Sequence, residues 1–367
     1  MNNNDMFWNS ESSNTPEEMS FEETSVDIDL PLAKKKARKT FSVLGFGLAV
    51  YTLISLVAAL IMQIIALVVS PALIEDVVFL NIISPLSLYV FALPVLLLVL
   101  FVFGGKGERP EKRRMGVGAW LLILLVSFGL MYIGSFSGQF VMWGVSEIVG
   151  YDYSNMLESM IDYDKMWVTA IFMCVVAPIG EEFVFRKLII DRTHKYGGFV
   201  CIFFSGLVFG LMHANFYQFF YAFALGLVLG YVYYSTGKIW YTIALHATIN
   251  FVGSIVVSYL DLGVTEMSEA LEVLNTESTQ EMLAFLGKFG FVIMAEYAFF
   301  ALVMISMICA VVLPIVLRKK IKLENRESVL PRKAMTVAAF LNVGVIIMML
   351  VYAVEFALNL IPPTIGQ

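Results

Sequence analysis

Two adjacent glutamates interrupt an otherwise apolar part of the chain. Glu181 and Glu182 follow Pro178, which lacks a backbone N–H, frees a carbonyl and favours a kink in a helix. Glu182 and Arg186 are four residues apart, so on a helix they share one face and are predicted to form an ion pair. Glu181 points about 100° away and has no such partner, which makes it a candidate general base. The spacing alone leaves open a purely structural Glu–Arg pair beside a glutamate without a chemical role.

Two histidines are predicted to reach the same region. Residue 197 is the midpoint between Glu181 and His213, and Gly197-Gly198 favours a turn there. Two antiparallel helices joined at that turn would hold Glu181 and His213 at about the same depth. Phe209 precedes His213 by one helical turn and lies on the same face.

His246 is expected about 12 Å into a further helix that begins near Lys238, at about 1.5 Å per residue. Asn250 follows four residues later on the same face. One carboxylate, two imidazoles and one amide can therefore converge on a buried spot. A single buried histidine is usually structural, but four such groups at one depth favour a site.

These groups are the components of water-activated acyl hydrolysis. Glu181 would take a proton from water, and His213 would hold and polarise that water. His246 and Asn250 would donate hydrogen bonds to the oxyanion of the tetrahedral intermediate.

Other chemistries fit the sequence less well. A serine mechanism is not favoured, because Ser205 has no evident base and no nucleophile elbow occurs. Two histidines and a glutamate could bind zinc, but the H-E-x-x-H motif is absent. A zinc site stays possible on these residues alone. His194 lies in a basic loop and is predicted to be solvated.

The elements that must position these residues are membrane helices. Of the 367 residues, 59% are hydrophobic and only 15% are charged, and the mean hydropathy is +0.81. No soluble fold of this length buries so much apolar surface, which excludes a soluble enzyme, a disordered chain and a nucleic-acid binder. Continuous rather than alternating apolar runs predict an all-α, polytopic transmembrane bundle of about eight to nine helices.

Nine apolar segments are expected, at 41–69, 78–103, 118–146, 166–188, 199–214, 216–235, 239–260, 289–317 and 334–361. The predicted organisation is a disordered acidic tail (1–33), N-terminal helices (34–164), a catalytic core (165–260), an outer amphipathic loop (261–288) and C-terminal helices (289–367). Two further intramembrane acids, Glu296 and Glu355, stand alone and are expected to be structural.

Charge predicts the orientation. Residues 1–33 hold eight acidic residues and no Lys or Arg, whereas the rest of the chain holds 22 acidic and 24 basic residues. If the N-terminus is cytoplasmic, 22 of those 24 basic residues fall in cytoplasmic segments, and only Lys165 and Lys288 lie outside. This bias predicts a multi-pass protein of the cell membrane with its N-terminus inside and its C-terminus outside.

The motifs Glu181-Glu182-xxx-Arg186, Phe209-xxx-His213 and His246-xxx-Asn250 resemble those of the CAAX protease and bacteriocin-processing family. This group includes CAAX prenyl protease 2 and lysostaphin resistance protein A-like proteins. The resemblance covers about residues 165–255. It implies an intramembrane glutamate-dependent endopeptidase in which the first glutamate of the pair is catalytic. Such proteins are often labelled metalloproteases, yet the motif chemistry needs no metal, so we predict no metal and no cofactor. It places Glu181, His213, His246 and Asn250 in the site, with Glu182, Arg186 and Phe209 shaping it.

The expected partners are the lipid bilayer and a peptide or membrane-protein substrate, prenylated or not. No nucleic-acid partner is expected. Two alternatives stay open. One is a catalytically silent membrane scaffold or bacteriocin-immunity protein of the same fold. The other is a carrier in which the acids and histidines relay protons, although no internal repeat supports it.

Overall fold

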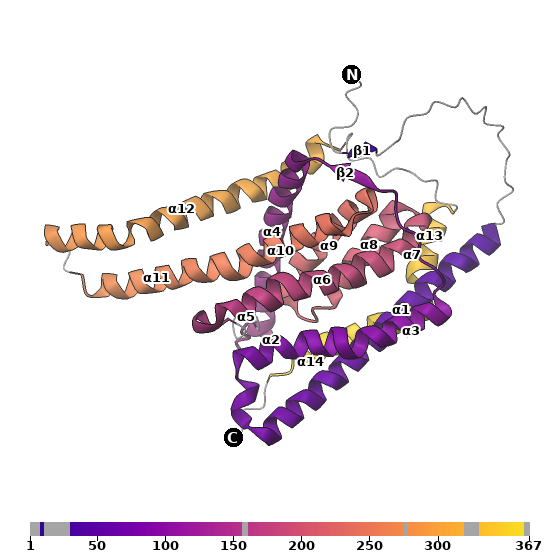
Figure 1. Cartoon of the computed structure of the whole chain (residues 1–367), viewed down its shortest axis with the longest axis horizontal. Coiled ribbons are helices and arrows are strands. Elements are labelled where there is room, and N and C mark those ends of the chain that lie inside the picture. Colours follow the sequence, from indigo (N-terminus) through magenta and orange to yellow (C-terminus); the bar gives the residue numbers. More distant parts are fainter. Residues whose placement is uncertain (1–7, 11–29, 156–160, 275–277, 319–329, 363–367) are drawn as a thin grey trace.

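A computed structural model describes residues 8–10, 30–155, 161–274, 278–318 and 330–362. Almost all regular structure in these ranges is helical (Figure 1). The exception is a pair of three-residue antiparallel strands, β1 (Trp8–Ser10) and β2 (Arg113–Met115), in which Trp8 lies opposite Met115. The predicted all-α class is confirmed.

Each of the nine predicted apolar segments corresponds to a helix or a continuous series of helices. The first three segments are α1 (Leu30–Val69); α2 (Val77–Pro85), η2 (Leu86–Ala92) and α3 (Leu93–Phe103); and α4 (Val117–Val149). The fourth segment is a series of seven short helices: η4 (Tyr163–Lys165), α5 (Met166–Ile171), η5 (Phe172–Val176), α6 (Ala177–Glu181), η6 (Glu182–Leu188), α7 (Ile189–Thr193) and η7 (His194–Tyr196). The last five segments are α8 (Gly198–Leu211); α9 (Phe216–Thr236); α10 (Ile239–Asn250), η8 (Phe251–Val256) and α11 (Val257–Glu272); α12 (Thr279–Val316); and α13 (Arg332–Phe340) with α14 (Val343–Asn359). A short 3₁₀ helix, η1 (Pro71–Ile74), connects α1 to α2.

Among the described residues, seven of these segments are long and apolar enough to cross a membrane, or eight if the bent α13–α14 pair is one span. Their outward faces carry large apolar side chains, such as Phe101 on α3 and Phe291 on α12, which are 86% and 78% exposed. Apolar side chains in that position are stable in lipid rather than in water. The chain is therefore a multi-pass membrane protein.

Two predicted boundaries differ from the structure. Helix α1 begins at Leu30, inside the predicted tail 1–33, and residues 1–7 and 11–29 of that tail lie outside the described residues. The predicted outer amphipathic segment, 261–288, is largely helical in its described residues, 261–274 and 278–288, and its helices continue into the neighbouring spans. Helix α11 continues from the preceding span to Glu272, and α12 begins at Thr279 (Figure 1). The polar residues after 260 extend the helix because no proline interrupts them.

Close helix crossings at glycines hold the bundle together. A Cβ added at Gly344 on α14 would lie 1.8 Å from the carbonyl oxygen of Ser42 on α1. A Cβ at Gly134 on α4 would lie 2.4 Å from the backbone of Tyr221 on α9. Only glycine allows these backbones to approach so closely, as is common between membrane helices.

The segment that bears the two glutamates is a modified helix. Residues 163–196 form one helical segment that contains two stretches of π-helix, η5 and η6. Pro178, the second residue of α6, has no N–H for the preceding turn and lies two residues after the end of η5. Glu181 is the last residue of α6, and Glu182 is the first residue of η6. The change in winding sets the directions of their two side chains.

Helix α8 is too short to cross the bilayer. Its 14 residues extend about 21 Å, whereas the hydrocarbon core is about 30 Å thick. The helix begins after the predicted turn at Gly197, whose φ of 106° favours glycine. It therefore ends inside the bundle, and the turn between α8 and α9, which carries His213, lies at the depth of the site.

Candidate active site

A buried ion pair lies at the centre of the site. Nε of Arg186 is 3.1 Å from Oε2 of Glu182, and neither side chain is exposed to solvent. The guanidinium group also lies 4.6 Å from the ring centroid of Phe209, which is a cation–π contact. The predicted pairing of Glu182 and Arg186 is therefore present.

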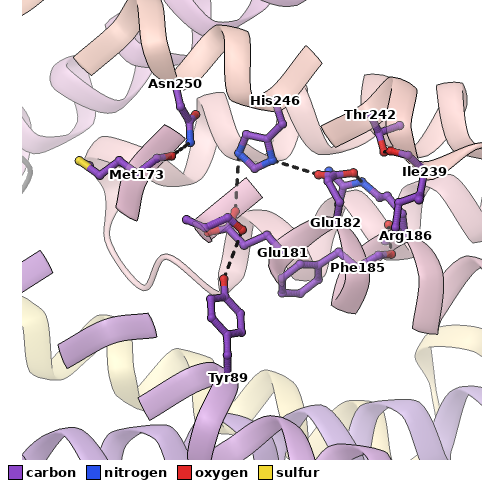
Figure 2. Close-up of polar contacts among 12 residues, drawn as sticks. Tyr89, Met173, Glu181, Glu182, Phe185, Arg186, Ile239, Thr242, His246 and Asn250 are labelled. Atoms are coloured by element: carbon purple, nitrogen blue, oxygen red, sulfur yellow. Dashed lines mark hydrogen bonds and ion pairs between the residues drawn. The ribbon is translucent and has the colours of Figure 1, made fainter. Parts of the chain in front are cut away.

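His246 connects the two glutamates. Its Nδ1 is 3.0 Å from Oε1 of Glu182, and its Nε2 is 3.6 Å from Oε2 of Glu181 (Figure 2). Since an ionised carboxylate only accepts hydrogen bonds, Nδ1 carries the proton that Glu182 accepts. Glu182 thereby fixes the orientation of the imidazole, and Nε2 faces the carboxyl group of Glu181.

Glu181 has a different environment from its neighbour. Its side chain is 13% exposed, and its carboxyl group lies 3.6 Å from Nε2 of His246. Tyr89 approaches it from η2, with its hydroxyl donating to the Ala177 carbonyl at 3.3 Å (Figure 2). A Cβ at Gly180 would lie 2.2 Å from the Tyr89 ring, so the absence of a side chain there admits the tyrosine.

His213 lies on the turn that follows α8 rather than within the helix. Its Nδ1 donates to the Phe209 carbonyl at 2.9 Å, because a carbonyl oxygen only accepts, and Nε2 is then a lone-pair acceptor when the ring is neutral. The Phe209 ring contacts both imidazoles edge to face, with centroid separations of 5.3 Å to His213 and 5.6 Å to His246. Phe209 thus forms a shared wall between them.

The side-chain amide of Asn250 uses one of its N–H groups in a contact between helices. Its Nδ2 donates to the backbone carbonyl of Met173 at 2.8 Å, which joins α10 to η5 (Figure 2). An amide group carries two N–H donors, so one N–H is still available. The structure brings together Glu181, Glu182, Arg186, Phe209, His213 and His246, with Asn250 one turn beyond His246.

The sequence did not predict the tyrosines around Glu181. The hydroxyls of Tyr51 on α1, Tyr89 on η2 and Tyr221 on α9 all interact electrostatically with its carboxyl group. No motif marks them, because they come from three separate elements. The glycine directly before Glu181 is a local feature that could have indicated the close approach of a ring.

Two further observations bear on the alternatives. The prediction that His194 is solvated is wrong, because its side chain is 3% exposed and Nδ1 contacts the Ile190 carbonyl at 3.2 Å. Among the described residues, no three His, Cys, Asp or Glu side chains are grouped as a metal ion would require.

The fold and this cluster define a class: a multi-pass helical membrane protein with a buried glutamate–histidine site. Residues 163–252 match the family described as type II CAAX prenyl endopeptidase, Rce1-like. This segment runs from η4 to η8 and contains all seven residues singled out from the sequence, so the resemblance to CAAX proteases is confirmed over this segment. No curated protein and no solved structure gave a significant match to the chain.

Proposed function

We propose that this protein is an intramembrane endopeptidase that uses glutamate-activated water. Its substrate would be a hydrophobic or lipidated peptide or protein, cut near its terminus. The observation that carries the proposal is the contact of His246 with both glutamates, one at Nδ1 and one at Nε2. The match to a family of CAAX endopeptidases supports the same reaction class.

The reaction begins with proton transfer to Glu181. This carboxylate takes a proton from a water molecule held by Nε2 of His213, and the water oxygen bonds to the scissile carbonyl carbon. The resulting oxyanion accepts a hydrogen bond from the second N–H of Asn250, and from Nε2 of His246 when both ring nitrogens carry a proton. When the C–N bond breaks, the proton on Glu181 passes to the leaving amine. One water is consumed, and the two products are a carboxylic acid and an amine; the acid then gives up the second water proton, which leaves a carboxylate and an ammonium group.

Glu182 and Arg186 act as positioning residues. Glu182 holds the Nδ1–H of His246, so that Nε2 is directed to the reaction centre. Arg186 balances the charge of Glu182 in a place without solvent. This division leaves Glu181 as the carboxylate that exchanges protons with the substrate.

The substrate class follows from the surroundings of the site. A cluster among membrane-spanning helices receives hydrophobic or lipid-modified chains most readily. The family's printed description names a prenyl endopeptidase, so a prenylated CAAX peptide is the first substrate to supply. We expect the N-terminus on the cytoplasmic side of the cell membrane, where the basic loops gather.

The test is peptide release by the purified full chain in liposomes. The substrates are a prenylated CAAX peptide and a pool of membrane-derived peptides, each with and without a chelator. Glu181→Gln should abolish release. Glu296→Gln is the matched control, since it removes a charge from another membrane helix, α12, and should leave release unchanged.

The outcomes separate the competing functions. Release that survives the chelator but not Glu181→Gln supports the metal-free glutamate mechanism. Release that the chelator abolishes would make the histidines metal ligands and overturn that mechanism. If a folded wild-type protein cleaves none of the peptides, the catalytically silent scaffold becomes the better reading.

A further inference from the structure

One face of helix α14 carries apolar residues near its start and polar residues near its end. Val345, Met348, Tyr352, Glu355 and Asn359 follow one another at intervals of three or four residues, so they lie on the same side of the helix. The first two are buried apolar residues and belong to the main core. The last three are polar, in a helix whose other face carries exposed Val354 and Leu358. A polar stripe inside a membrane helix requires partners within the protein.

The polar stripe meets polar residues of α1. The Thr52 hydroxyl donates to the Tyr352 hydroxyl at 3.2 Å, and both side chains are buried. Tyr51, the neighbour of Thr52, interacts electrostatically with Tyr352 and also with Glu181. Glu355 interacts in the same way with Tyr352.

The series continues into the candidate active site. Tyr89 interacts electrostatically with Tyr51, Glu181 and Glu182, and its ring lies against Gly180. Glu355, Tyr352, Tyr51 and Glu181 therefore form a line, a series in which each group interacts electrostatically with the next. Tyr51, Tyr89, Tyr352 and Glu355 all lie outside the segment that matches the CAAX endopeptidase family. They belong to the N-terminal and C-terminal helices of this chain.

Two buried atoms on this line lack a hydrogen-bond partner among the described residues: Oη of Tyr51 and Oε2 of Glu355. Tyr51 is only 1% exposed. A buried polar atom without a partner costs about 1–3 kcal/mol, and ordered water is the usual remedy where several polar groups surround the position. Each of these atoms has hydroxyl or carboxyl groups nearby, which gives a water the two to four partners that it needs.

We propose that ordered water molecules occupy the line from Glu355 past Tyr352 and Tyr51 and deliver the hydrolytic water to Glu181. This inference rests on the proposed function, because a hydrolase consumes one water for each bond it cleaves. The surrounding lipid supplies no water, so a protein-lined path is required. Glu355, which is half-buried at the far end of α14, is where water is taken up. This assigns a role to a glutamate that its sequence context indicated to be structural.

The first test detects the water itself. Full-length protein is exposed to short X-ray pulses, and hydroxyl radicals formed from bound water oxidise the side chains that touch it, which mass spectrometry locates. Tyr51 and Tyr352 should be oxidised several-fold faster than Tyr233. Tyr233 is the matched control, because it is also 1% exposed but its hydroxyl donates to Asp191 at 2.7 Å. Equal rates at the three tyrosines would overturn the proposal.

The second test removes the point of water uptake. Glu355→Leu should reduce oxidation of Tyr51 and lower kcat several-fold without a change in KM, whereas Glu355→Gln, which still hydrogen-bonds to water, should retain both. Thermal unfolding checks that each variant is folded. Loss of oxidation with an unchanged kcat would refute delivery along this line. Because oxidation needs no catalysis, it should persist in Glu181→Gln. Oxidised Tyr51 in a wild-type protein that cleaves no peptide would contradict the proposed function and leave the waters established.

Discussion

Removing Arg186 should destabilise the protein far more than removing an ordinary buried side chain. The guanidinium group is fully buried, with its Nε 3.1 Å from Glu182, so Arg186→Met leaves the Glu182 carboxylate without its arginine. His246 Nδ1 still donates to that carboxylate, at 3.0 Å. Breaking one side of a buried ion pair typically costs about 3–5 kcal/mol. Loss of the cation–π contact with Phe209 adds about 1–2 kcal/mol in a desolvated place.

The double variant Glu182→Gln/Arg186→Met separates charge from packing. It removes both charges, while the glutamine oxygen still accepts the Nδ1–H of His246. Stability should therefore recover to within about 1–2 kcal/mol of the wild type, since a buried pair replaced by neutral groups of similar volume is often close to neutral. The measurement is the free energy of unfolding in mixed micelles for the wild type, both single variants and the double variant. Peptide release is measured in parallel.

The free energies of unfolding of the single and double variants test whether Glu182 and Arg186 depend on each other. If Arg186→Met unfolds within about 1 kcal/mol of the wild type, the charge of Glu182 does not depend on Arg186, and the buried pair is not what orients His246. If the effects of the two single variants simply add in the double variant, the two side chains do not interact in the folded protein. Either result would refute the reasoning from the buried pair.

Three other results are expected. Asn250→Ala should lower kcat by about 100- to 1,000-fold with little change in KM, as measured by peptide release, because an oxyanion donor acts mainly in the transition state. Gly134→Ala should destabilise by about 1–3 kcal/mol, since its Cβ would lie 2.4 Å from the backbone of α9, whereas Gly144→Ala on the same helix, with nothing within 4 Å, should not; thermal unfolding of the pair distinguishes them. Asp76 caps α2, and its hydrogen bond to Lys165 is the main cause that lowers its pKa below 3.8. A lowered folded-state pKa gives stability that is complete above the unfolded value and is lost as the pH falls through the folded one. Asp76→Asn should therefore flatten the loss of stability below about pH 4, read from melting temperatures across an acid series.

Local periodicity was enough to locate the helices and the motif residues. The Gly197 turn and the spacing of Glu182 and Arg186 are local features, and both are present as predicted. The place of His213 on a turn could not be foreseen, because it depends on where α8 ends inside the bundle. The same holds for the start of segment 261–288, because α11 extends beyond the apolar part of the preceding span to Glu272.

The contacts between helices could not be predicted from the sequence for a different reason. Asn250 shares a face with His246, as expected, but its contact with the Met173 carbonyl depends on the π-helix η5, which widens the facing segment. No periodic pattern predicts where a helix is overwound or underwound. Likewise, Tyr51 and Tyr89 reach Glu181 from helices that are distant in sequence, and each tyrosine is unremarkable within its own apolar run.

These contacts change how the site should be understood. The segment that resembles CAAX endopeptidases supplies the carboxylates, the imidazoles and the amide. The helices outside it supply the hydroxyls of Tyr51, Tyr89 and Tyr352 and the carboxyl group of Glu355. A glutamate buried among lipid-facing helices has no contact with bulk water. The motif residues can therefore hydrolyse a peptide only where the surrounding helices supply them with water. For this reason, water uptake should follow α1 and α14, and exchanging residues of these two helices should change the rate of hydrolysis while the motif residues stay intact.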